Sequence, residues 1–296
     1  MGEDMRIVRY KGGLGNQMFQ YAFMRSLDSG IHKAGASLGF YKDFPMSRHF
    51  ELDKVFYNVQ LKEESRYDEI FNTRYAIWKN KSEADRDQLN VGIWFEEREE
   101  EGKYQQDVYE QEDCVFVGYW QSYRYFETIK EKFLSSSVPK FSCSFFPEET
   151  VSAINSALNL DANSVAVHIR RGDYLQAEDM YGNICTNEYY LRAIAYMREK
   201  IENPTFFFIS DDIEWVAKQN LVKDGIYIRA DSFKRYEDWY DMAIMSLAGH
   251  NIIANSSFSW WGAWLNQNQQ KIVIAPKKWN NLSNYTDICP PDWIRI

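Results

Sequence analysis

The sequence predicts an α/β fold built on parallel sheets with helices on both faces. Short apolar runs alternate with helical patterns through the C-terminal half of the chain, which is typical of a doubly wound sheet. Residues 165–169 form one of these runs, and their Val-Ala-Val-His-Ile sequence suits a strand buried on both faces. Near the start of the chain, residues 6–27 combine a strand pattern, a glycine-rich loop and an apolar helix pattern.

The composition indicates a folded globular protein whose ligands are not nucleic acids. With 296 residues, 45% of them hydrophobic and 26% charged, the chain can form two domains of ordinary size. Its 34 basic and 43 acidic residues give a net charge of −9, which argues against a protein that binds nucleic acid by neutralising phosphates. The many aromatic residues suit stacking surfaces for sugars or bases, although aromatic-rich cores explain most of them.

Cysteine usage and hydropathy predict a cytoplasmic protein without a transmembrane segment. Cys114, Cys143, Cys185 and Cys289 lie far apart, lack metal-site spacing and follow no signal peptide. Residues 242–270 contain no Asp, Glu, Lys or Arg, but polar residues interrupt them midway, as in a strand, turn and buried helix. Peripheral association with the inner face of the membrane stays open beside a soluble state.

In the N-terminal half we expect a strand over residues 6–10 and a helix over residues 18–27, joined by Lys-Gly-Gly-Leu-Gly-Asn-Gln. The three glycines permit positive φ, and Asn16 and Gln17 are placed to hydrogen-bond a ligand at the helix start. The alternative is a tight turn with no ligand. The spacing departs from the dinucleotide fingerprint, so a nicotinamide cofactor remains only an open alternative.

Residues 40–113 show weak periodicity and form an irregular insert in the prediction. Within them, residues 96–113 are strongly acidic, which we interpret as a solvated face without chemistry. A strand over residues 115–120 and a helix over residues 123–134 follow.

Residues 135–147, rich in Ser and Pro, are the best linker candidate. The sequence therefore predicts two domains, over residues 1–145 and 146–296.

The second predicted domain alternates helices with strands. The expected helices and strands are, in order, residues 147–158 (helix), 165–169 (strand), 187–201 (helix), 205–209 (strand), 213–219 (helix), 226–228 (strand), 236–248 (helix), 251–254 (strand), a helix opened by the turn at residues 255–264, and 271–275 (strand).

The loop after residues 165–169 carries the strongest chemical signal. With a side-chain period of two, His168 and Arg170 project to the same face at the C-terminal end of the strand, where open α/β sheets bind ligands. Arg170 and Arg171, followed by a glycine, form a receptor for a dense anion such as a diphosphate. The alternative is a salt bridge between Arg171 and Asp173 that only braces the strand end.

Two further strand-end loops complement the arginines. A carboxylate at Asp211 or Asp212 suits the two parallel N–H donors of guanine, and the alternative for either residue is a helix N-cap. The hydroxyl groups of Ser257 and Ser259, with N–H groups at a helix start, suit phosphate oxygens, and the alternative is a capping turn. The tryptophans in residues 260–264 are interpreted as core.

Four ordered motifs resemble the α-1,2-fucosyltransferases, and more closely their bacterial members, which lack a membrane anchor. The motifs are Gly-Gly-Leu-Gly-Asn-Gln-Met-Phe-Gln-Tyr-Ala at residues 12–22, His-Ile-Arg-Arg-Gly-Asp-Tyr at 168–174, Ile-Ser-Asp-Asp at 209–212 and Asn-Ser-Ser-Phe-Ser-Trp-Trp-Gly at 255–262. Together they extend over most of the chain.

This resemblance implies the GT-B architecture, in which two Rossmann-like domains face a central cleft. It further implies an inverting transferase that moves L-fucose from GDP-fucose to the 2-hydroxyl of a terminal β-galactose, without a metal ion or other cofactor. The implied acceptor is a galactose-terminated oligosaccharide or glycolipid. Residues 40–113 match least, so the acceptor is the least defined part.

The resemblance also implies roles for individual residues. Arg170 contacts the donor diphosphate, and His168 with an acid of the Ser-Asp-Asp motif contacts the guanine. Arg171 and the Asn-Ser-Ser-Phe-Ser loop belong to the same donor site, while the N-terminal glycine loop lies close to the fucose and the acceptor. The implied substrate-binding residues outside the catalytic pair Arg170 and Asp173 are Gly13, Gly15, Asn16, Gln17, His168, Arg171, Asp211, Asp212, Ser256, Ser257, Phe258 and Ser259.

The expected chemistry places negative charge on the leaving GDP as the C1–O bond breaks, and Arg170 neutralises that charge. Asp173 and His168 are both candidates for a general base, and a dissociative mechanism without a strong base stays open. The remaining alternatives are a GDP-sugar-modifying dehydratase or oxidoreductase and a non-catalytic GDP-binding regulatory module.

Overall fold

The computed structural model describes residues 5–27, 33–43, 49–52, 61, 77, 80, 94–97, 103–112, 114–129, 148–233, 239–282 and 287–296. The chain divides into two compact units. Unit 1 comprises Met1–Glu99 and Lys103–Phe133, and unit 2 comprises Glu100–Gly102 and Leu134–Ile296. The predicted linker and domain boundary fall within residues 130–147, outside the described residues.

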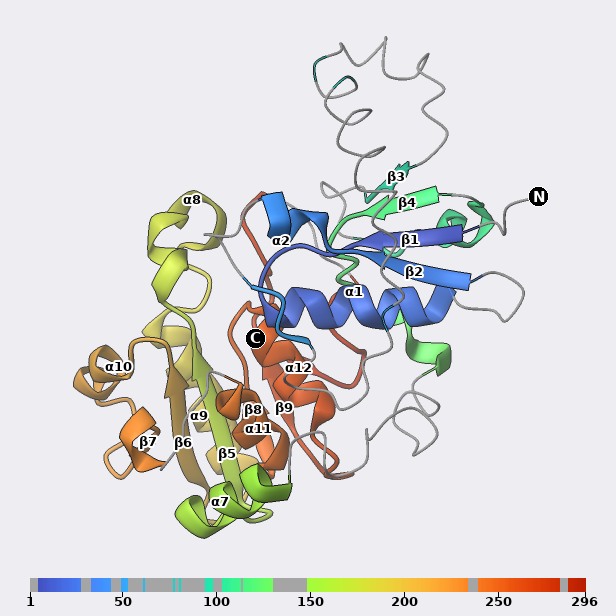
Figure 1. Cartoon of the computed structure of the whole chain (residues 1–296). Coiled ribbons are helices and arrows are strands. Elements are labelled where there is room, and N and C mark those ends of the chain that lie inside the picture. The colour runs from blue at the N-terminus through green and yellow to red at the C-terminus, as the bar shows by residue number, and fades with distance from the viewer. Residues whose placement is uncertain are drawn as a thin grey trace. The chain divides into compact units, whose positions relative to one another are not determined.

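Unit 1 contains a parallel four-stranded sheet of order β2-β1-β4-β3 (Figure 1). Parallel strands of this kind need both faces covered, which explains why the four residues of β4 are apolar and buried. In β1, Ile7 and Val8 are fully buried, and the flanking Arg6 and Arg9 are also buried. The strands are β1 (Met5–Arg9), β2 (Lys33–Ser37), β3 (Trp94–Glu96) and β4 (Cys114–Val117).

Helix α1 (Leu14–Leu27) packs its aromatic residues into the core of unit 1. The ring of Phe23 stacks on Trp120 at 4.2 Å between centroids and meets Phe116 edge-on at 5.4 Å. Most of the aromatic residues described in unit 1 are buried in this way, as expected for core packing. A short helix, α2 (Gly39–Asp43), follows β2.

Three predictions for unit 1 need correction. The helix expected over residues 123–134 begins as two short 3-10 helices, Tyr123–Tyr125 and Glu127–Ile129, and its remaining residues lie outside the described ones. Among the loop glycines only Gly12 has positive φ, at 80°. The acidic segment is not only a solvated face, because Oε2 of Glu97 accepts hydrogen bonds from the backbone N–H groups of Tyr119 and Trp120 at 2.6 and 2.8 Å.

Unit 2 contains a parallel six-stranded sheet of order β10-β9-β8-β5-β6-β7 (Figure 1). From β5 the chain winds outward through β6 and β7, and then returns to the other side through β8, β9 and β10. The winding direction therefore changes between β5 and β8, which is where doubly wound sheets open a ligand crevice. The strands are β5 (Ser164–Ile169), β6 (Thr205–Ser210), β7 (Ile226–Tyr227), β8 (His250–Ile252), β9 (Val273–Ala275) and β10 (Ile294–Arg295).

Helices cover the two faces of this sheet. Val165, Val167 and Ile169 pack in one apolar cluster with Tyr189 and Ile194 of α9, so the predicted period-two face is confirmed. On the other face α11 contacts β5 and packs against α12. The helices of unit 2 are α7 (Glu148–Leu158), α8 (Glu178–Tyr181), α9 (Asn187–Lys200), α10 (Ile213–Gln219), α11 (Tyr240–Leu247) and α12 (Ser257–Leu265).

The prediction of an α/β fold with two Rossmann-like units is confirmed by the two parallel sheets. The predicted helices and strands of unit 2 are all present, with ends shifted by a few residues. The helix expected from residue 236 begins at Tyr240 in the described part of the chain, and residues 234–238 lie outside it. Within the described ranges, none of the helices combines the length and the apolar character needed to cross a bilayer.

Candidate donor site at the carboxyl edge of the unit 2 sheet

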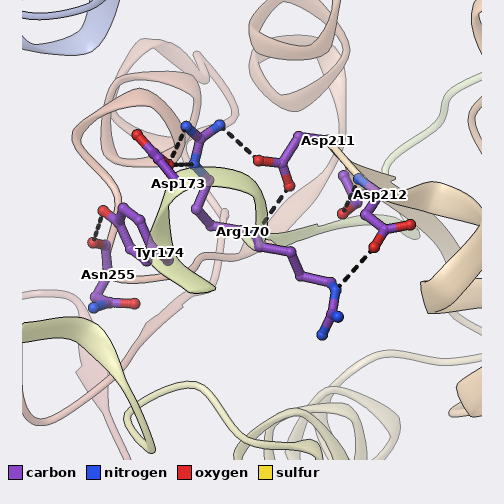
Figure 2. Close-up of polar contacts among 8 residues, drawn as sticks. Arg170, Asp173, Tyr174, Asp211, Asp212 and Asn255 are labelled. Atoms are coloured by element: carbon purple, nitrogen blue, oxygen red, sulfur yellow. Dashed lines mark hydrogen bonds and ion pairs between the residues drawn. The ribbon is translucent and has the colours of Figure 1, made fainter. Parts of the chain in front are cut away.

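The register of the sheet brings the arginine loop and the aspartate pair together. Ile169 at the end of β5 lies opposite Ser210 at the end of β6, so the next residues, Arg170 and Asp211, are neighbours. Nη1 of Arg170 forms an ion pair with Oδ2 of Asp211 at 2.9 Å, as Figure 2 shows. The predicted meeting of these two loops is therefore confirmed.

Asp173 holds the other side of the Arg170 guanidinium. Nε and Nη2 of Arg170 donate to Oδ1 of Asp173 at 3.1 and 2.6 Å (Figure 2). Asp173 reaches this position because the chain after Arg171 turns into a 3-10 helix, Gly172–Gln176. Burial alone would lower the pKa of Arg170, but the carboxylates of Asp211 and Asp173 outweigh it and raise the pKa, so the guanidinium stays charged.

Arg171 points to a different partner from the one considered in the sequence analysis. Its Nε forms an ion pair with Oδ2 of Asp212 at 3.1 Å, and its guanidinium lies 3.5 Å from the ring centroid of Trp215. The alternative of a salt bridge between Arg171 and Asp173 is thus wrong, because the carboxylate of Asp173 bonds Arg170. The guanidinium of Arg171 instead pairs with a carboxylate and stacks on an aromatic ring, both of which suit its planar group.

The two aspartates have separate tasks. Oδ1 of Asp212 accepts from the backbone N–H of Trp215 at 3.3 Å, which makes it the N-cap of α10. Oδ1 of Asp211 accepts from the backbone N–H of Arg171 at 2.9 Å (Figure 2). The N-cap alternative is therefore confirmed for Asp212, while Asp211 fixes the arginine loop. A Cβ atom at Gly172 would clash with Oδ2 of Asp211, so a side chain there would displace the carboxylate that fixes the loop.

His168 is buried beside this cluster. Only 4% of its surface is exposed, and its Nδ1 has no hydrogen-bond partner among the described residues. Its ring lies 5.8 Å from that of Phe258. Burial, together with the positive charge of Arg170, lowers the pKa of His168 to about 3, so the imidazole is neutral near pH 7.

The serine loop opens α12 next to His168. Ser256 occupies the N-cap position without a side-chain capping bond, so the capping alternative does not hold for its hydroxyl. Ser259 is fully buried, and its hydroxyl donates to the carbonyl groups of Ala254 and Ser256 at 3.3 and 3.1 Å. Ser257 and Phe258 form the partly exposed first turn of the helix. The adjoining tryptophans are buried, which confirms their interpretation as core.

Two residues inside the motifs have structural tasks that the sequence did not reveal. The hydroxyl of Tyr174 donates to the carbonyl of Asn255 at 2.8 Å (Figure 2), and its ring stacks on Tyr181 at 4.0 Å. Nδ2 of Asn255 donates to the carbonyl of Trp279 at 2.9 Å. Asn255 therefore connects the loops that follow β5, β8 and β9. An aromatic residue directly after the arginine loop was the available signal for Tyr174.

The glycine loop belongs to unit 1, and its polar residues are bonded within that unit. Gln17 is fully buried; its Nε2 donates to the carbonyls of Gly12 and His49, and its Oε1 accepts from the backbone N–H groups of Glu51 and Leu52. Oδ1 of Asn16 accepts from Gln121 at 2.7 Å. The carbonyl of Gly13 accepts hydrogen bonds from the backbone N–H groups of Asn16 and Gln17. Gly15 lies buried in α1. The loop is thus a tightly bonded turn.

The fold and the unit 2 site together define a class of protein. A doubly wound parallel sheet carries a buried neutral imidazole, a fixed arginine and a helix start around its topological switch point. Of these features, a helix start at the topological switch point is the one with which α/β proteins bind the phosphates of nucleotides.

Comparison with known proteins defines this class further. The family model described as glycosyl transferase family 11 matches residues 2–296. An alpha-1,2-colitosyltransferase of Escherichia coli is 36% identical over 98% of both chains. The galactoside 2-alpha-L-fucosyltransferase Sec1 of Mus musculus is 25% identical over 99% of this chain and 74% of that protein. The crystal structure of fucosyltransferase NodZ from Bradyrhizobium matches weakly, with a TM-score of 0.49 and 12% identity over 88% of this chain and 92% of that chain.

The chain belongs to glycosyl transferase family 11, and it is a glycosyltransferase. The resemblance found in the four motifs is thereby confirmed. The alternatives of a sugar-nucleotide dehydratase or oxidoreductase and of a non-catalytic GDP-binding module are not favoured.

Proposed function

We propose that this glycosyltransferase moves L-fucose from GDP-fucose to the 2-hydroxyl of a terminal β-galactose, with inversion at the anomeric carbon. The geometry of Arg170 carries the proposal. A guanidinium has five N–H donors; two bond Asp173 and the Nη1 nitrogen faces Asp211, which leaves two donors for a ligand. The linkage and the acceptor are supported by two relatives, one named as a 1,2-colitosyltransferase and the other as a galactoside 2-fucosyltransferase.

In this proposal Arg170 stabilises the leaving group. When the bond between C1 of the sugar and the β-phosphate oxygen breaks, the electron pair stays on GDP and the sugar acquires oxocarbenium character. A cation that two carboxylates already hold in place needs no reorganisation when this charge develops, and such preorganised donors lower the barrier most. The first turn of α12, with Ser257, would supply further N–H and O–H donors to the phosphates.

Neither His168 nor Asp173 has the surroundings of a strong general base. The lowered pKa of His168, about 3, makes its neutral imidazole a weak proton acceptor, and the residue is buried. Asp173 shares its Oδ1 with two nitrogen atoms of Arg170. We therefore propose a loose, dissociative transfer in which the acceptor hydroxyl loses its proton late, to a phosphate oxygen of the leaving GDP or to solvent.

We also propose that the transfer needs no metal ion. The adjacent carboxylates Asp211 and Asp212 resemble an acidic pair that could hold a divalent cation. In unit 2, however, these two carboxylates form ion pairs with Arg170 and Arg171 and accept hydrogen bonds from two backbone N–H groups. The cationic groups of the protein thus take the place that a metal would have beside a diphosphate.

A second candidate donor is GDP-colitose, because one relative is named a colitosyltransferase. Colitose lacks the 3-hydroxyl group of fucose, so the two donors differ by one hydrogen-bonding group. Incubation of the purified protein with each GDP-sugar and a panel of galactosides, followed by NMR assignment of the linkage, tests both. We expect transfer from GDP-fucose to O2 of galactose; exclusive use of GDP-colitose, or a product linked elsewhere, would overturn the proposal.

A further inference from the structure

A pocket with cationic residues in its walls lies at the carboxyl edge of the unit 2 sheet, where β9 and β10 end. It has a volume of about 660 Å³, which is within the range of small-molecule sites. The loop that follows β9 forms one wall, and the loop that follows α8 forms another. Its lining residues are Gly182, Asn183, Ile184, Arg192, Pro276, Lys277, Lys278, Asn281 and Ile296.

The charge of this pocket is strongly one-sided. Arg192, Lys277 and Lys278 line it, and no aspartate or glutamate is among the lining residues. Arg192 has one ion pair in the described structure, an exposed contact of 3.3 Å with Glu188. The guanidinium of Arg295 donates to the carbonyl of Lys277 and adds a fourth positive charge beneath the loop. Three lining cations, one of them paired with Glu188, stand out in a chain with a net charge of −9.

The walls of the pocket are fixed before any ligand binds. Asn281 connects them, because its backbone N–H donates to the carbonyl of Met180 at 2.8 Å and its Nδ2 donates to that of Gly182 at 3.0 Å. The backbone N–H of Lys277 donates to the carbonyl of Ile296 at 3.1 Å. A prearranged site loses less conformational entropy on binding than a mobile one. The backbone of the loop is therefore held, while the two lysine ammonium groups stay exposed at the pocket.

We propose that this pocket is a second anion site, which binds a phosphate group separate from the donor diphosphate. A phosphate offers several oxygen atoms, and two ammonium groups and one guanidinium can bind them at the same time. The volume leaves room for a further group attached to the phosphate. Such a phosphate occurs in two sources, a soluble phosphate ester and the headgroup of an anionic lipid.

The test compares two pairs of substitutions that change charge equally. The pocket variant is Lys277→Gln with Lys278→Gln. The control is Lys218→Gln with Lys223→Gln, two exposed lysines at and after the end of α10, the helix that leads away from the carboxyl edge. Both variants lose two positive charges, so a general electrostatic effect weakens binding equally. A third variant, Lys277→Arg with Lys278→Arg, keeps the charge and should keep the binding.

Inorganic pyrophosphate, titrated by calorimetry in the presence of excess GDP, probes the soluble source. Co-sedimentation with phosphatidylcholine vesicles, with and without phosphatidylglycerol, probes the lipid source. We expect one of the two probes to bind the pocket variant at least about tenfold more weakly than the wild type, with the control unchanged. If the pocket variant binds pyrophosphate more weakly, the ligand is a soluble phosphate ester. If it binds only the anionic vesicles more weakly, the ligand is a lipid headgroup. Equal binding of both probes to the pocket and control variants would overturn the proposal, whichever GDP-sugar the protein uses.

Discussion

Replacing Arg170 by lysine separates the charge of this residue from its shape. Arginine can bond Asp173 twice, face Asp211 and still direct two N–H groups elsewhere. A lysine ammonium has three N–H groups, and contacts with the two carboxylates occupy two of them. One donor is left where arginine leaves two, and it is not part of a planar pair. The substitution thus keeps the charge and removes at least one directed donor.

The expected loss follows from that count. Removal of one donor to a developing negative charge costs roughly 10²–10³-fold in kcat, or about 2.7–4 kcal/mol. Because the charge on GDP is greatest in the transition state, kcat should fall at least as much as KM rises. Steady-state rates with GDP-fucose and a β-galactoside measure both constants, and a GDP-release assay in single turnover isolates the chemical step.

Arg171→Lys is the matched control, one residue away in the same loop. It removes the stacking of the guanidinium on Trp215, so we expect it to act on stability, by roughly 1 kcal/mol, with a much smaller effect on kcat. Both variants should first be compared by urea unfolding. If folded Arg170→Lys turned over at nearly the wild-type rate, Arg170 would not be the group that stabilises the leaving diphosphate.

Three further predictions concern stability, pH and metals. Asp212→Ala removes the N-cap of α10 and the partner of Arg171, so urea unfolding should show a loss of about 1–2 kcal/mol. Glu214→Ala, which breaks an exposed ion pair with Arg229 in the first turn of the same helix, should cost clearly less. Because the pKa of His168 is about 3 when folded and near 6.5 when unfolded, the unfolded chain binds the additional proton, and stability falls as pH drops below 6.5. From pH 7 to pH 5 the wild type should lose up to about 2 kcal/mol more than His168→Gln, and equal losses would contradict the buried neutral imidazole. Activity should survive EDTA, and recovery of a lost activity by added Mg²⁺ or Mn²⁺ would refute metal independence.

The sequence predicted most of unit 2 because local pattern and tertiary environment agree there. Residues 165–169 and 205–209 are apolar runs, and both become strands buried on the sheet, as the pattern requires. In unit 1 the agreement is weaker. Residues after Tyr123 have a helical pattern, yet Tyr125 and Phe126 are buried, and the chain turns through 3-10 geometry to place them there.

For the site, the sequence could predict which loops meet but not which side chains pair. Parallel strands end at one edge, so the contact of Arg170 with Asp211 followed from topology. Asp173 pairs with Arg170 and not with Arg171 because the chain turns through the 3-10 helix Gly172–Gln176. No periodicity in the sequence indicates this turn. The fully bonded state of Gln17 likewise depended on a segment more than thirty residues away, Glu51 and Leu52.

The bonds of Asn255 also determine how this edge of the protein can open. Its carbonyl accepts a hydrogen bond from the hydroxyl of Tyr174, which lies 81 residues away in the sequence. Its side chain donates to the carbonyl of Trp279, which lies 24 residues away. We expect contacts between segments so distant in sequence to form late in folding, because the entropy cost of closing such loops is repaid only once the sheet between them exists. In the native state we expect these connections to couple the hydrogen exchange of the three loops, so that a ligand that orders one loop also protects the others.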